Sequence, residues 1–193
     1  MKKVLRVTVA IVIMAALVVG YYFFLSRNVK QKDKTDDTVS EYAKIVNTDL
    51  VNDYPSTPRS VVKMYNRVIT EYYAKDHEDE QVEKLCNQAR MLFDDELLAQ
   101  NPKEEFYKSV KADILTYKNR KARIAQSKVC SSNDVVYNKY NGYDIAYVWA
   151  YYFSKEGNDF TKTYQQYCLR KDKNGKWKIL TWQLVDGDPD MFD

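Results

Sequence analysis

The spacing of hydrophobic positions changes once along the chain and separates a helical part from an extended part. Between residues 57 and 120, apolar side chains recur every three or four positions, the period of one face of an α-helix. Thr57 and Pro58 have the residue types of an N-cap and a first helical position. Three main helices are therefore expected, with the apolar stripes Val61, Tyr65, Val68 and Tyr72; Val82, Leu85, Ala89 and Leu92; and Phe106, Val110, Ile114 and Tyr117.

After residue 120 the period becomes two, which is typical of β-strands. Strands are expected near residues 123–131, 134–140, 143–155, 160–171 and 176–185. Asn141-Gly142 and Asn174-Gly175 lie between such runs, and Asn-Gly favours a tight hairpin because both residues accept positive φ. Helices first and strands second predict an α+β fold, in which three helices pack on one face of a curved antiparallel sheet.

The strand expected at residues 143–153 is apolar on both faces. One face carries Tyr143, Ile145, Tyr147, Trp149, Tyr151 and Phe153, and the other carries Asp144, Ala146, Val148, Ala150 and Tyr152. A strand of this kind is expected to be covered on both sides. The pattern does not decide which face meets the helices.

The amino-terminal part of the chain predicts a membrane span. Residues 7–25 contain no charge and are long enough, as a helix, to cross the hydrocarbon core of a bilayer. Lys2, Lys3 and Arg6 precede the span, and aromatic side chains at residues 21–24 end it. These bulky residues disfavour a cleaved signal peptide, so an uncleaved signal-anchor is expected, with the carboxyl-terminal bulk outside the cytoplasm.

This interpretation divides the chain into five segments. We expect a short cytoplasmic tail at 1–6, a transmembrane signal-anchor at 7–25 and a juxtamembrane linker at 26–54. A short amphipathic helix is expected inside the linker, since Thr38 and Glu41 have the spacing of a capping box. An extracytoplasmic α+β domain at 55–186 and an acidic tail at 187–193 complete the chain.

Charge limits the classes of partner. The chain has 30 Lys and Arg against 27 Asp and Glu, and three of the basic residues precede the span. The remaining chain is therefore neutral and lacks the field that a nucleic-acid partner requires. The expected partners are the membrane, through a single span, and a second copy or another protein outside the cytoplasm.

Catalytic and metal-binding motifs are sparse. His77 is the only histidine and is expected to be an exposed loop residue, which disfavours a Ser-His-Asp or Cys-His device. Cys86, Cys130 and Cys168 are isolated from one another, so no metal site is expected. Whether Cys130 and Cys168 form a disulfide stays open. No cofactor motif is present.

Two weaker hypotheses concern specific side chains. Asp144 begins the small-residue face of an apolar strand, where burial would raise its pKa and suit a general base. Tyr147, Trp149, Tyr151 and Tyr152 are candidates for ligand binding, because aromatic rings offer large contact areas and most carry a polar tip.

A set of motifs across nearly the whole chain resembles one group of proteins: residues 54–59 (YPSTPR), 88–90 (QAR), 93–98 (FDDELL), 169–171 (LRK) and 177–180 (WKIL). Together with the order of elements, they resemble uncharacterised, membrane-anchored extracytoplasmic proteins of Gram-positive bacteria with a nuclear-transport-factor-2-like, or cystatin-like cone, domain. The resemblance implies a fold and no activity. The wider fold includes ketosteroid-isomerase-like enzymes and bitopic scaffold subunits of type IV secretion systems.

The expected function is therefore a single-pass, membrane-anchored extracytoplasmic module for binding or assembly, non-catalytic and with an unknown ligand. The alternative is a pocket enzyme of the isomerase or dehydratase type that uses Asp144 as general base. Burial of Asp144 in a closed cavity would favour the enzyme.

Overall fold

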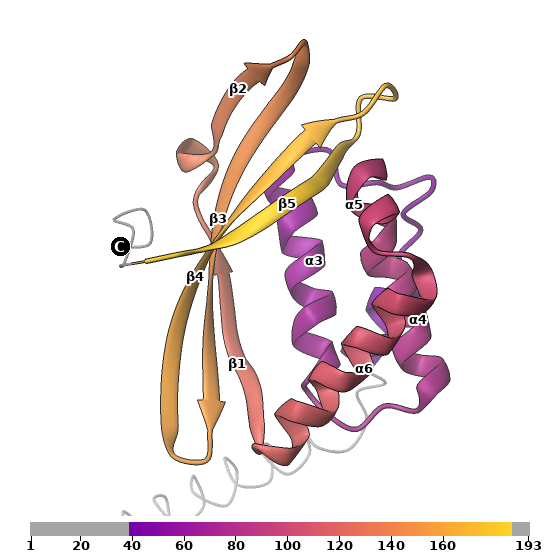
Figure 1. The fold of residues 1–193 in the computed structure, drawn as a ribbon, viewed down its shortest axis with the longest axis vertical. Coiled ribbons are helices and arrows are strands. Elements are labelled where there is room, and N and C mark those ends of the chain that lie inside the picture. Colours follow the sequence, from indigo (N-terminus) through magenta and orange to yellow (C-terminus); the bar gives the residue numbers. More distant parts are fainter. Residues whose placement is uncertain (1–38, 187–193) are drawn as a thin grey trace, which may run out of the picture. The chain divides into compact units, whose positions relative to one another are not determined.

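The computed structural model describes residues 39–186 and has an α+β fold (Figure 1). The α-helices of this part come first: α2 (Glu41–Val46), α3 (Pro58–Tyr72), α4 (Asp79–Met91), α5 (Asp95–Gln100) and α6 (Lys103–Asn119). The strands follow: β1 (Ala122–Val129), β2 (Val136–Tyr140), β3 (Tyr143–Glu156), β4 (Asp159–Lys171) and β5 (Trp177–Val185), with the short 3-10 helix η1 (Ser132–Asp134) between β1 and β2.

Local capping chemistry sets the helix starts. Thr57 and Ser60 form a capping box at the start of α3, as the sequence predicts. The short helix expected after residue 38 begins at Glu41, and the Ser40 hydroxyl caps it. The third predicted helix is preceded by a separate one-and-a-half-turn helix, α5, which starts at the N-cap Asp94 and is too short to show a periodic stripe.

The sheet is antiparallel throughout, with the order β1-β3-β4-β5. Strand β2 also pairs with β3, so β1 covers the carboxyl-terminal half of one β3 edge and β2 covers the amino-terminal half. The predicted Asn141-Gly142 hairpin is confirmed, with φ of 49° and 84° at the two residues. Strand β3 is thus the centre of the sheet and contacts three other strands.

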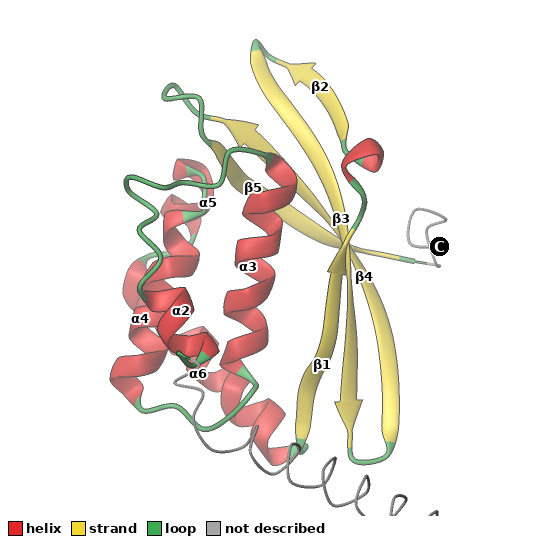
Figure 2. Ribbon diagram, turned by 180° about the vertical axis from the view of Figure 1, so that it is seen from behind, coloured by secondary structure: helices red, strands yellow, loops and turns green. Residues whose placement is uncertain are grey.

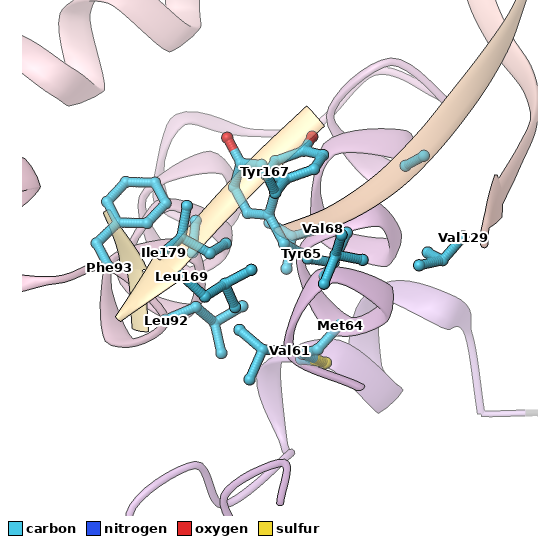
Figure 3. Packing of buried hydrophobic residues seen from close by; sticks show 14 of the residues in the cluster. Val61, Met64, Tyr65, Val68, Leu92, Phe93, Val129, Tyr167, Leu169 and Ile179 are labelled. Carbon is cyan, nitrogen blue, oxygen red and sulfur yellow. The ribbon is translucent and has the colours of Figure 1, made fainter. Parts of the chain in front are cut away.

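The described α-helices, α2 to α6, lie on one side of the sheet, as the view from behind shows (Figure 2). The core fills the space between the two layers. Tyr65 and Val68 of α3 pack there with Leu169 of β4 and Ile179 of β5, and Tyr167 is fully buried among them (Figure 3). Burial of this apolar surface is the main stabilising contribution to the fold.

The two faces of β3 are now distinguished. Ala146, Val148, Ala150 and Tyr152 are buried in the core, so the even-numbered positions face the helices. The odd-numbered positions form the outer face, where Tyr147, Trp149 and Tyr151 lie. The structure decides what the alternation alone left open.

The core extends into the segment that was expected to be a linker. Ile45 of α2 is 0% exposed and Leu50 is 2% exposed, and both belong to the hydrophobic core. The described residues from Ser40 onward belong to one compact unit, and the core cluster lies within it. This part of the chain therefore has what an independently folding unit requires.

Three predicted segments fall outside the described residues: the cytoplasmic tail at 1–6, the span at 7–25 and the acidic tail at 187–193. Residues 26–38 of the predicted linker also lie outside them. Within residues 39–186, no helix is long and apolar enough to cross a bilayer.

Candidate functional site

Three of the four predicted ligand-binding residues come together on the outer face of the sheet. Tyr147, Trp149 and Tyr151 alternate along β3, and their cross-strand neighbours on β4 are Cys168, Gln166 and Tyr164. All three side chains are partly exposed. None of the described α-helices covers this face (Figures 1 and 2). The outer face therefore presents a row of aromatic rings on β3, flanked on β4 by a thiol, an amide and the largely buried ring of Tyr164.

Toward the β3–β4 hairpin, lysine side chains lie over the aromatic rings of this face. Lys162 Nζ is 4.8 Å from the ring centroids of both Tyr151 and Tyr164. Lys155 Nζ is 5.3 Å from the ring of Phe160, which stacks on Phe153 at 5.1 Å. The cation–π attraction holds these long side chains against the outer face. The part of this face next to the β3–β4 hairpin is therefore basic as well as aromatic.

The fourth candidate, Tyr152, points to the opposite side of β3. Its hydroxyl is 2.5 Å from both Asn66 Oδ1 and the Tyr167 hydroxyl, and Tyr167 donates to Gln165 Oε1 at 2.7 Å. Burial raises the pKa of the Tyr152 and Tyr167 phenols, so both stay neutral and able to donate. Tyr152 is thus part of a buried polar chain and is separated by the sheet from the outer row.

Near this chain, a cavity of about 250 Å³ opens between α3, α6 and the sheet. Tyr65, Tyr73, Tyr117 and Trp182 supply rings to its walls, and Ser154, Thr163 and Gln165 supply neutral polar groups. Its single charged lining residue is Asp113. Burial, with a contribution from the Asp113 carboxylate, raises the pKa of Tyr73. A cavity without a cation suits a neutral ligand better than an anion.

Asp144 lies in a different and more open place. Its side chain is 43% exposed, and its Oδ1 is 3.5 Å from Lys139 Nζ. It lines an open groove of about 680 Å³ together with Tyr137, Ile145, Lys171 and Trp177. Asp144 therefore does not lie in a closed cavity. No observation in the described part of the chain favours Asp144 as a catalytic group.

His77 differs from its expected position. Its side chain is 1% exposed, with Nε2 3.0 Å from the Glu71 carbonyl oxygen and 3.3 Å from Glu71 Oε1. The ring also packs against Tyr42 of α2 at 5.4 Å. The prediction of an exposed loop histidine was wrong, because α2 folds over this loop. The arrangement ties α2 to the end of α3 and presents no nucleophile.

The three cysteines are free thiols. Cys86 and Cys130 are buried, whereas Cys168 is partly exposed on the outer face. Burial raises the pKa of the Cys86 thiol to about 11, which keeps it protonated and unreactive. Among the described residues, no group of three potential ligands could hold a metal ion.

One charged cluster escaped the sequence analysis. Arg170 of β4 binds both oxygens of Asp94 and donates to Glu96 Oε1 at 2.7 Å, and its guanidinium lies 4.9 Å from the Tyr143 ring. Asp94 is 4% exposed and is also the N-cap of α5. The only sequence signal was the cap pattern of Asp94 before two acidic residues, since the partner lies 76 positions away. The cluster fixes α5 to the sheet.

The family match covers residues 1–182, and the family is described as a domain of unknown function, DUF6715. The chain belongs to this family. The match includes the apolar amino-terminal stretch as well as the helices and most of the sheet. A comparison with curated proteins gives no match. Membership of DUF6715 therefore shows which residues the family model matches and assigns no chemistry to them.

Proposed function

We propose that this DUF6715 protein is a non-catalytic binding or assembly module that a single amino-terminal span holds at the outer side of the cell membrane. The observation that carries the proposal is the aromatic row Tyr147, Trp149 and Tyr151, which no described α-helix covers. Partly exposed aromatic surface on an otherwise well-packed domain is typical of an interaction site.

The anchor and the finer fold assignment are parts of the same proposal. The uncharged run at 7–25 and the basic residues before it support a signal-anchor with the folded part outside the cytoplasm. The layering of helices on one face of a twisted antiparallel sheet supports a nuclear-transport-factor-2-like cone. We infer this fold assignment from the topology and from the sequence motifs that resemble those of nuclear-transport-factor-2-like proteins.

Site-specific photo-crosslinking in intact membranes tests the proposal. A benzophenone amino acid replaces Tyr147 in one variant and Leu115 in the control, because Leu115 is exposed on α6, in the helix layer. The outer-face variant is expected to give a discrete adduct on irradiation, and the control is expected to give none. An outer-face variant that is recovered only as the free chain would contradict the proposal.

A further inference from the structure

Strand β2 is a free edge of the sheet. It pairs with β3 on one side, and no strand of the described residues pairs with it on the other (Figure 1). All five of its residues, Val136–Tyr140, are exposed. The strand contains no proline, and its register with β3 runs without a bulge. A regular, exposed edge of this kind accepts a further strand readily.

The hairpin determines which backbone groups of β2 are free. Its two-residue turn lies between Tyr140 and Tyr143, and hydrogen-bonded and non-hydrogen-bonded pairs alternate from this closing pair onward. The N–H and C=O groups of Tyr137 and Lys139 therefore point away from β3. In agreement, the Lys139 N–H donates to the side-chain oxygen Oδ1 of Asn138, at 2.7 Å, and not to β3.

Two copies of β2 fit together as antiparallel strands about a two-fold axis at Asn138. This register sets Tyr137 of each copy opposite Lys139 of the other, so all the outward backbone groups of both residues find a partner. An axis at Lys139 would oppose two like charges, and an axis at Tyr137 would set Lys139 opposite Val135, outside the strand. Charge and backbone pairing therefore select the axis at Asn138.

The side chains are complementary in this register. On the helix-facing side, Lys139 meets the Tyr137 ring of the second copy as a cation–π pair and keeps its own partner Asp144, which is 3.5 Å away. On the outer side, Val136 meets Tyr140, and these side chains are 49% and 69% exposed in the single chain. A lysine usually protects an edge from pairing. Here it lies opposite a ring and not opposite another cation.

We propose that β2 is a dimerisation edge, through which two copies of the chain join their sheets about an axis at Asn138. The contact is five residues long on each copy and is smaller than the about 800 Å² per partner of a stable dimer. The inference rests on the proposed function, because two chains anchored in one bilayer have the high effective concentration that a small interface needs. The joined sheets present both aromatic rows on one continuous outer face.

Cysteine crosslinking of the full chain in intact membranes tests the axis. Residues that oppose each other without mutual hydrogen bonds have Cα atoms about 4.5 Å apart, which suits a disulfide. Asn138→Cys is therefore expected to give a disulfide-linked dimer on oxidation with diamide. The control is Lys173→Cys on the β4–β5 turn, which is also exposed. Both variants carry Cys168→Ala, and the other two cysteines, Cys86 and Cys130, are buried.

The Asn138→Cys variant is expected to give at least about tenfold more dimer than the control, because only its thiols meet at the axis. Equal yields from the two variants would show random collisions in the membrane. That result, or no dimer from Asn138→Cys, overturns the proposal.

A pair of differently tagged variants tests the register. Val136→Cys and Tyr140→Cys lie opposite each other only across the proposed axis, so a disulfide between them is expected when both are produced in one cell. Either variant alone places its two thiols four positions, about 13 Å, apart along the strands and is expected to give little dimer. Equal dimer yields from the mixed and single variants would contradict this register and overturn the proposal.

A proline tests the role of the backbone edge. Lys139→Pro, added to Asn138→Cys, removes an N–H that points away from β3, so the hairpin is kept while the pairing between copies is lost. The dimer yield is expected to fall at least about tenfold. The matched control, Lys139→Ala, keeps the N–H and is expected to lose less. An undiminished yield from the proline variant overturns the proposal. Circular dichroism verifies folding, and the tagged pair decides if the proline variant unfolds.

Two further arms separate other occupants and the proposed function itself. An Asn138→Cys adduct with a different protein would show another partner, and a dimer that appears only after removal of residues 187–193 would show that the chain covers its own edge; each overturns the proposal. The full chain is also extracted with alkaline carbonate. A chain that stays in the membrane without the Asn138→Cys dimer refutes only this inference. A released chain refutes the anchored module, and the crosslink then decides the dimer by itself.

Discussion

The two faces of strand β3 are both largely apolar and have opposite roles. The helix-facing positions Ala146, Val148 and Ala150 are 0% exposed, and small side chains there let α3 and the sheet approach closely. The outer positions carry larger rings, which remain partly exposed and are covered by one another and by lysines. Hydrophobicity along a strand therefore does not report burial by itself. The neighbouring layer decides which apolar face becomes core and which becomes a surface for binding.

The largest expected effect contrasts consecutive residues of β4. Leu169 is 0% exposed on the helix-facing side, and Cys168 is partly exposed on the outer side. Leu169→Ala is expected to lower the free energy of unfolding by about 2–5 kcal/mol through lost burial and the cavity left behind. Cys168→Ala is expected to change it by less than about 1 kcal/mol. Urea denaturation measures both, and equal losses would show that the outer face is as tightly packed as the core.

Arg170 provides a sharper contrast, because it lies on the outer face and yet has a buried partner. Arg170→Ala leaves the Asp94 carboxylate, with 5% side-chain exposure, without its cation and is expected to cost about 3 kcal/mol of folding free energy. Lys139→Ala removes an exposed pair with Asp144 and is expected to cost less than about 1 kcal/mol.

Thermal or urea unfolding of both variants gives the comparison. Arg170→Lys keeps the charge but loses the two-pronged geometry, so an intermediate loss is expected. A loss from Arg170→Ala no larger than that from Lys139→Ala would show that the cluster is solvated and does not hold α5 on the sheet.

The smallest effect concerns pH and one buried ring. Burial raises the pKa of Tyr167, so the unfolded chain releases this proton at lower pH than the folded chain. Stability is unaffected well below pH 10 and falls as pH rises above it. One pH unit above the unfolded-state value, the loss is about 1.4 kcal/mol for this residue.

Tyr167→Phe removes that proton. Between pH 8 and pH 11, the free energy of unfolding of the variant is therefore expected to rise relative to that of the wild type by about 1.4 kcal/mol. Urea midpoints of the wild type and the variant at both pH values measure the change in the stability gap between them. A constant gap across this interval would mean that Tyr167 ionises equally in the folded and unfolded chains, and that the helix-facing side is accessible to water.

Much of the fold followed from local signals. Thr57-Pro58 marked the start of α3, and Asn141-Gly142 marked the β2–β3 hairpin, because capping and turn geometry depend on adjacent residues. The candidate site was predicted less completely than the fold. Alternation correctly grouped Tyr147, Trp149 and Tyr151 on one face and Tyr152 on the other, but it did not predict the hydrogen bond of Tyr152 to Asn66 or the packing of α2 on His77. Neither outcome has a signal within a few residues of the position concerned.

The sequence by itself determined the elements, their order and the alternation of side chains on β3, since backbone period and turn chemistry are local properties. Only the tertiary structure decided that the even positions of β3 face the helices and that Arg170 meets Asp94 across 76 positions. These outcomes depend on strand register and on which layer packs where. Both are set by the packing of the whole domain, and no short segment contains that information.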